Sequence, residues 1–275
     1  MRFLLLILVV ISTLFAINIT CRAQNETINI RQLLSKATNE TSSILFTMDY
    51  PFGNRTTGNY SQIIDSIANT TGASGQFSKV YSETMKNIAS QLKEMRSDHE
   101  LFVKKFEATF AAYFLKACFA ESNNELPETS EWKCFFSNTD ARPWQIVLLG
   151  VNAHINIDFW QALTDNFSEK EIRQNKKQLL ACRYSVAKVY SPLFDTMIAE
   201  SRYLNFINAF TKGFARTLGE KIMFKWRRRA INLAILFYHE PEKFKKRWKI
   251  IKKKKAKNDK LILRKNFLRS SYEKH

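Results

Sequence analysis

The chain has 275 residues, of which 45% are hydrophobic and 25% are charged, with 22 Phe but only seven Gly and five Pro. So few turn-forming residues, together with the lack of an alternating apolar and polar pattern, argue against a β-sheet protein and favour helices. The formal net charge of +18 is concentrated in residues 221–275, which hold 20 Lys and Arg against four Asp and Glu.

The first 23 residues have the features of a signal peptide. Arg2 supplies a positive charge, residues 3–17 are apolar apart from two hydroxyl residues, and Ala23 precedes a cleavage site. The apolar run is too short to span a bilayer comfortably. We therefore expect an exported protein, periplasmic or secreted, with a mature chain of residues 24–275. The alternative is an uncleaved N-terminal anchor.

Three cysteines remain in the mature chain, Cys118, Cys134 and Cys182. An oxidising compartment permits a disulfide, and Cys118 and Cys134 are the nearest pair in the sequence. An odd number leaves one thiol over, and buried free cysteines are common. The sequence leaves a disulfide and free thiols equally open, and none of the spacings resembles a zinc site.

Residues 24–73 are rich in Asn, Ser and Thr, and we expect an irregular segment that contains one short helix over 60–68. From residue 74 to residue 240, apolar residues recur at spacings of three and four, which predicts one helical domain. The expected helices cover 77–95, 101–120, 144–165, 168–190, 193–213 and 218–238, with a break at Ser191-Pro192. The predicted fold class is all-α, a single-domain bundle of about six or seven helices.

Residues 241–275 predict a basic amphipathic helical tail outside that domain. Between Lys243 and Lys257, ten residues are basic and none is acidic, and Phe244, Trp248 and Ile251 recur at helical spacing. Helices of this kind lie on anionic membranes or bind polyanions. An exported protein rarely meets nucleic acid, so we expect an anionic membrane or lipopolysaccharide surface as the partner; the alternative is a solvated tail. The residues expected to contact that surface are Lys245, Lys246, Arg247, Trp248, Lys249, Lys252, Lys253, Lys254 and Lys255.

One polar cluster lies in the most apolar of the expected helices. His154 and Asp158 are one turn apart and share a face, and Asn152 and Asn156 form a second pair with the same spacing. Burying these side chains without partners would cost several kcal/mol, so each must be hydrogen-bonded or must bind a ligand.

His and Asp at this spacing can chelate a metal ion, or can act as a general base and the carboxylate that orients it. A metal ion needs a third ligand, for which Glu107 and Asp140 are candidates by residue type alone. We therefore take His154 and Asp158 as candidate catalytic residues and, with Glu107, as candidate ligands of one divalent metal ion. The alternative is a polar lattice in which the cluster ties neighbouring helices together.

The stretch 148–159 resembles the LLGMNAHINxDL signature of a widespread bacterial family of unknown function. Residues 75–84, 106–117 and 226–234 are similar to three further helices of that family in the same order, with Glu107 where an Asp is usual. The resemblance covers about residues 74–238. It implies an all-helical domain and supplies no activity.

The patterns leave two main functions open, and they do not decide whether the chain is an enzyme. The first is an exported metal-assisted hydrolase, which requires a cleft that reaches His154. The second is a non-enzymatic binding protein held at an anionic membrane or lipopolysaccharide surface by residues 243–275, with binding that falls steeply as salt rises. A carrier of a small apolar ligand in the aromatic core is a third hypothesis, and it requires a sizeable closed cavity.

Overall fold

The computed structural model describes residues 55–93, 96–200, 205, 208–209 and 214–264, so the predicted signal peptide, the segment 24–54 and the end of the predicted tail lie outside the described residues. Every regular element in these ranges is a helix, which confirms the all-α, single-domain prediction. The elements are α2 (Arg55–Ala68), α3 (Gly72–Leu92), α4 (Ser97–Ser122), α5 (Lys133–Phe136), α6 (Pro143–Ala153), η1 (His154–Asp158), α7 (Phe159–Thr164), α8 (Glu169–Gln174), α9 (Lys176–Ala181), α10 (Arg183–Glu200), α12 (Phe214–His239) and α13 (Pro241–Ile262).

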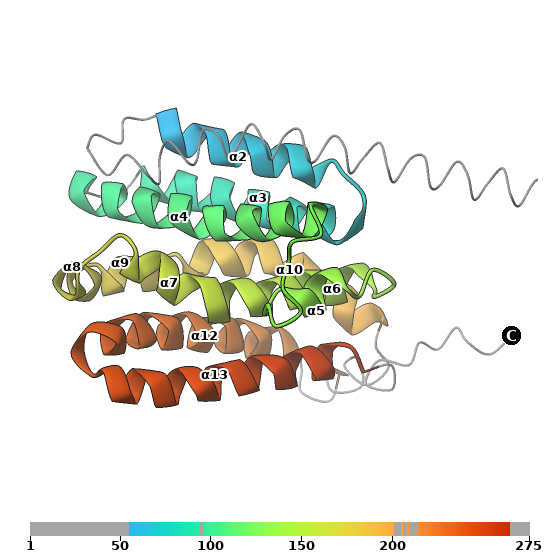
Figure 1. Cartoon of the computed structure of the whole chain (residues 1–275). Coiled ribbons are helices and arrows are strands. Elements are labelled where there is room, and N and C mark those ends of the chain that lie inside the picture. Colours follow the sequence, from blue (N-terminus) through green and yellow to red (C-terminus); the bar gives the residue numbers. More distant parts are fainter. Residues whose placement is uncertain (1–54, 94–95, 201–204, 206–207, 210–213, 265–275) are drawn as a thin grey trace, which may run out of the picture.

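The long helices are stacked in layers (Figure 1). Helix α2 packs on α3 and α4, the middle layer holds α6, η1 and α7, and α12 and α13 form the opposite edge. The short segment η1 contacts α4 on one side and both α12 and α13 on the other. It is therefore enclosed by the bundle. None of the helices in the described ranges is long and apolar enough to cross a membrane.

The helix expected over 144–165 is a rod made of α6, η1 and α7. Its middle segment η1 is a π-helical turn, in which the N–H of Phe159 bonds to the carbonyl of His154 five residues earlier. π-turns inside α-helices are rare and are frequent at functional sites. The polar residues predicted from the sequence therefore lie at or beside a local irregularity of the backbone.

The core consists of two clusters rich in aromatic rings. One contains Phe77, Phe114 and Trp132, and the other contains Phe106 and Phe159. Gly150 on α6 allows a close approach to α3, because a Cβ atom at this position would lie 2.5 Å from Cδ2 of Phe77. Glycine is required here by space, since Phe77 is itself fully buried.

The segment predicted to be a separate tail is helix α13, and it is part of the bundle. Helix α13 lies against α12, α6 and η1. Ile251 is buried in this interface, and Phe244 and Trp248 both pack beside Trp160 on α7. The predicted boundary at residue 240 is wrong over 241–262, because neighbouring helices cover the apolar stripe of α13.

Two further expectations change. The short helix predicted over 60–68 is present, but it begins earlier, at Arg55. The break predicted at Pro192 is wrong, since α10 continues through this residue. Proline removes one backbone hydrogen bond from a helix, but Tyr190 and Phe194 on either side are buried in the bundle and hold the helix in place. The cysteines Cys118, Cys134 and Cys182 are free thiols.

Candidate functional site

The structure brings His154 and Asp158 together in the π-turn η1, as their spacing predicts. Nδ1 of His154 lies 2.8 Å from Oδ2 of Asp158. Nε1 of Trp132, from the loop between α4 and α5, donates to the same oxygen at 3.1 Å. The sequence did not single out Trp132, because this contact depends on how a distant loop folds over η1.

Aromatic rings enclose the imidazole of His154, which is only 2% exposed. Phe110 stacks on the imidazole with ring centroids 3.5 Å apart, and Tyr81 meets it edge to face at 4.9 Å. Phe77 and Trp132 lie next to the same ring, each at 5.9 Å. Nε2 of His154 has no hydrogen-bond partner among the described residues. The imidazole is therefore fixed in the core and does not face a cleft.

Burial shifts both members of the pair towards their neutral forms. It lowers the pKa of His154 well below its usual value, and the positive charge of Arg227 lowers it further. It raises the pKa of Asp158 well above its usual value, although the hydrogen bond from Trp132 acts in the opposite direction. In these neutral forms the carboxyl group of Asp158 can donate to Nδ1 of His154, which leaves the N–H at Nε2 without a partner among the described residues. A metal ion would have to displace the proton of this pair, because metal binding needs the carboxylate form.

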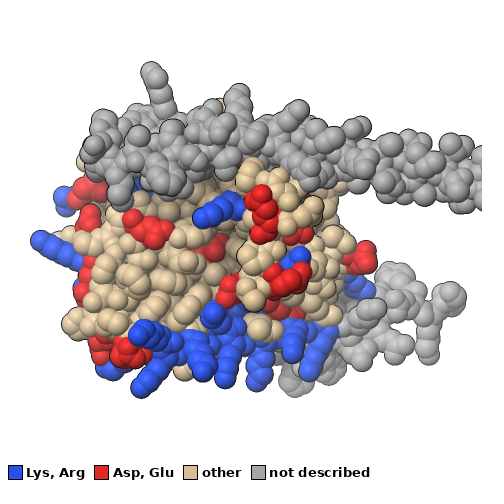
Figure 2. Space-filling view, in the orientation of Figure 1, with Lys and Arg blue, Asp and Glu red and all other residues tan. Residues whose placement is uncertain are grey.

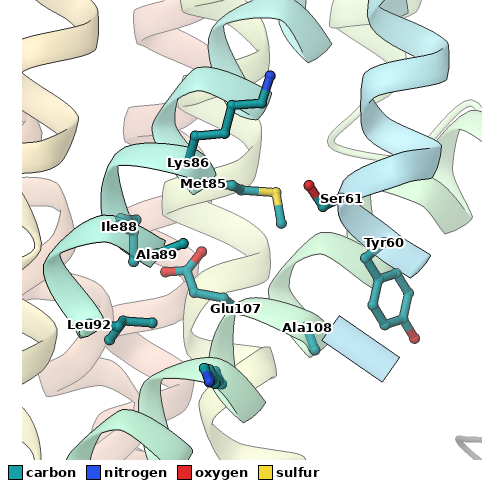
Figure 3. Close-up of a pocket in the computed structure, with 10 residues that line it drawn as sticks. Tyr60, Ser61, Met85, Lys86, Ile88, Ala89, Leu92, Glu107 and Ala108 are labelled. Carbon is teal, nitrogen blue, oxygen red and sulfur yellow. The ribbon is translucent and has the colours of Figure 1, made fainter. Parts of the chain in front are cut away.

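The predicted metal-ligand set of His154, Asp158 and Glu107 is not assembled. Within the described ranges, no three His, Cys, Asp or Glu side chains are grouped so that they could hold a metal ion. Glu107 is on α4, and its carboxyl group points into a separate pocket between α2, α3 and α4 (Figure 3). The other candidate, Asp140, is exposed in the loop before α6.

Asn152 and Asn156 form a polar lattice that joins the middle layer to α13. Nδ2 of Asn152 donates to the backbone carbonyl of Lys255 at 3.0 Å and to Oδ1 of Asp259 at 2.8 Å. Nδ2 of Asn156 donates to Oδ1 of Asn152 at 2.8 Å, and Arg229 on α12 donates to Oδ1 of Asn156. These bonds give the two asparagines a structural role. This is the polar lattice that the sequence left open as the alternative to a ligand site.

Lys255 was predicted to contact an anionic surface, and that prediction is wrong. Its side chain is 4% exposed, and Nζ lies 2.7 Å from Oδ2 of Asp259. Nζ also donates to the backbone carbonyl of Glu131, in the loop before α5. Asp259 is the only acidic residue between Lys243 and the end of α13. That single acid within a run of lysines was the signal that could have revealed this buried anchor.

The remaining predicted surface residues divide according to the side of α13 on which they lie. Trp248 is half-buried, with its ring centroid 5.2 Å from that of Trp160, so it is unavailable to a membrane. Figure 2 shows Lys and Arg side chains in a row along the edge of the molecule that α13 forms in Figure 1. The predicted surface residues that are exposed are Lys245, Lys246, Arg247, Lys249, Lys252, Lys253 and Lys254.

Comparison with known proteins places this architecture in a family. A model described as a family of unknown function, DUF5995, matches residues 57–264. The chain belongs to this family. The match confirms that the chain is similar to a family of unknown function. It extends the region beyond 74–238, so that all of α13 and all but the first two residues of α2 lie within the DUF5995 domain. No curated protein and no solved structure was found to match the chain.

Proposed function

We propose that the protein is a non-enzymatic binding protein that attaches to an anionic lipid surface through the exposed basic face of α13. The observation that supports this proposal is the fixed orientation of α13. Its apolar side is docked on the bundle, and the lysines of the opposite side are exposed (Figure 2). The surface is therefore built into the domain and does not depend on a free tail.

The centre of this face is a stripe that remains free of ion pairs. Its members recur at spacings of three and four along α13, cover about 21 Å at 1.5 Å per residue, and form no ion pair with a described residue. A basic residue near an anionic membrane contributes about 1 kcal/mol, so a stripe of this kind can hold a protein there. The members of this α13 stripe are Lys246, Lys249, Lys253, Lys257 and Lys260.

The same geometry makes the attachment electrostatic and excludes insertion of the apolar stripe while α13 stays docked. Phe244, Trp248 and Ile251 would have to leave the bundle before they could enter a bilayer. Ile251 is only 1% exposed, and Trp248 and Phe244 contact Trp160. Binding should therefore follow the charge of the α13 stripe and weaken as salt screens it.

The test compares two variants that lose the same charge from different surfaces. Deleting residues 243–275 is unsuitable, because α13 supplies part of the core. Instead, Lys246, Lys249, Lys253 and Lys257 are replaced by Gln. In the matched control, four exposed lysines on other helices, Lys79, Lys116, Lys170 and Lys177, are replaced by Gln. Both proteins are sedimented with phosphatidylglycerol-containing vesicles and with lipopolysaccharide micelles.

We expect the α13 variant to bind about a thousandfold more weakly than the wild type, at about 1 kcal/mol for each lysine. The control should stay within a few-fold of the wild type. Equal losses in the two variants would contradict a role for α13 itself, and so would equal binding of the wild type to neutral phosphatidylcholine vesicles. Tighter binding to duplex DNA than to either lipid would make the stripe a nucleic-acid surface and overturn the proposal.

The proposal includes the exported location that residues 1–23 predict. The metal-assisted hydrolase has less support, because it needs a base that reaches a substrate. His154 is enclosed by rings, and burial shifts the pKa values of both His154 and Asp158 in the direction of their neutral forms. A metal ion that copurifies with the wild type and is lost in His154→Ala would restore the hydrolase hypothesis.

A further inference from the structure

A pocket unrelated to α13 lies between α2, α3 and α4 (Figure 3). Its volume of about 300 Å³ is at the lower end of the range for small-molecule sites. Much of its wall is apolar, formed by Met85, Ile88 and Leu92 from α3 and Ala108 from α4. Such a pocket fits a small ligand with a short apolar body.

One buried carboxyl group points into this pocket. Glu107 is 8% exposed, and Figure 3 shows its carboxyl group directed from α4 towards Ala89 on α3. Glu107 forms no hydrogen bond or ion pair with any described residue. A buried carboxylate without a partner is costly, so Glu107 is a polar group that a ligand could satisfy.

The lysines that line the pocket already have carboxylate partners. Nζ of Lys86 lies 3.2 Å from Oδ1 of Asp65 and 3.2 Å from Oε1 of Glu83. Nζ of Lys104 lies 2.7 Å from Oε1 of Glu100. These pairs neutralise both lysines, so the unmatched charge in the pocket is that of Glu107. The missing partner is therefore a cation.

The pKa values of Glu107 and of the titratable groups around it are consistent with a cation as the missing partner. Burial raises the pKa of Glu107 to about 7, and the positive charge of Arg227 on α12 only partly opposes this. Burial is the main cause that raises the pKa values of Tyr81 on α3 and of Cys182 before α10, and a negative charge on Glu107 raises both further. A cation bound in the pocket would return Glu107 to its ionised form.

We propose that the pocket between α2, α3 and α4 binds a small organic amine, with Glu107 as the counter-ion of its ammonium group. The apolar chain of the amine lies against Met85, Ile88, Leu92 and Ala108. This activity is separate from lipid binding, because none of these residues belongs to the basic face of α13.

The probe is n-hexylamine, which is protonated at pH 8, titrated calorimetrically into the full chain beside n-hexanol and n-hexanoate. The amine should bind at least about tenfold more tightly than the alcohol, as expected for a charge-assisted hydrogen bond in a buried site. Glu107→Gln should reduce amine binding to the level of the alcohol. Glu121→Gln, a carboxylate on the same helix but outside the pocket, should leave it unchanged.

A second variant, Ala108→Leu, keeps Glu107 and fills the pocket, so it should weaken both the amine and the alcohol. This variant keeps the proposal testable if Glu107→Gln does not fold, as judged by circular dichroism. The proposal is overturned if the folded wild type binds no amine, if amine and alcohol bind equally, or if folded Glu107→Gln retains the wild-type preference for the amine.

Discussion

The polar residues of η1 and the exposed lysines of α13 have opposite environments. His154, Asp158 and Asn156 are buried, with hydrogen bonds to their own helix or its neighbours, whereas Lys246 and Lys253 are exposed and have no ion-pair partner among the described residues. Both sets stand out in the sequence as functional candidates. The comparison teaches that the polar groups of η1 are engaged in hydrogen bonds within the bundle, while the exposed lysines of α13 remain available to a partner.

The sharpest form of this comparison is between two adjacent lysines of α13. Lys255→Met should lower the free energy of unfolding by about 3–5 kcal/mol, because it leaves the buried carboxylate of Asp259 without its cation. Lys254→Met removes the same charge from the exposed side and should change stability by less than about 0.5 kcal/mol. Chemical denaturation measures both values. Similar effects of the two substitutions would break the distinction between the buried and exposed sides of α13.

A second prediction concerns the pH dependence of stability at Glu107. Its pKa is about 7 in the folded protein and near 4.5 when exposed, so between these pH values the folded state holds a proton that the unfolded state has lost. Stability should therefore fall as pH rises from about 4.5 to 7, by about 3 kcal/mol in total. Glu107→Gln should remove this fall and be more stable than the wild type at pH 8. An unchanged pH profile in Glu107→Gln would contradict the buried, unpaired carboxylate.

A third prediction, with a smaller expected loss than Lys255→Met, concerns the contact between α6 and α3. Gly150→Ala places a methyl group against the buried ring of Phe77 and should cost about 1–3 kcal/mol through overpacking. Thermal unfolding followed by circular dichroism measures the loss. A variant as stable as the wild type would mean that α6 and α3 can separate easily, and that the enclosure of His154 is looser than the structure shows.

The sequence predicted the long helices well, because apolar spacing reports directly on a buried helix face. The segments expected over 77–95 and 101–120 correspond to α3 and α4. The same signal could not tell that α13 is docked. Phe244, Trp248 and Ile251 form one apolar stripe whether the stripe packs on protein or on a membrane, and only the tertiary contacts distinguish the two.

The candidate site was predictable where it depends on neighbours along one helix. The spacing of His154 and Asp158 fixed their contact, but the role of Glu107 depends on which way α4 turns its side chain relative to η1. Asp259 contacts Asn152 on α6, which lies 107 residues earlier in the chain. Trp132 contacts Asp158 in η1, which lies 26 residues later. Residue type alone carries no information about such distant pairs.

The measurement that tests the central claim most directly is the salt dependence of wild-type binding to phosphatidylglycerol-containing vesicles. If α13 stays docked and binds by charge alone, binding should be lost at 1 M salt, where the screening length is about 3 Å. Binding that persists at this salt concentration would mean that Phe244, Trp248 and Ile251 leave the bundle and enter the bilayer. That result would contradict the account of α13 as a fixed basic face of the domain.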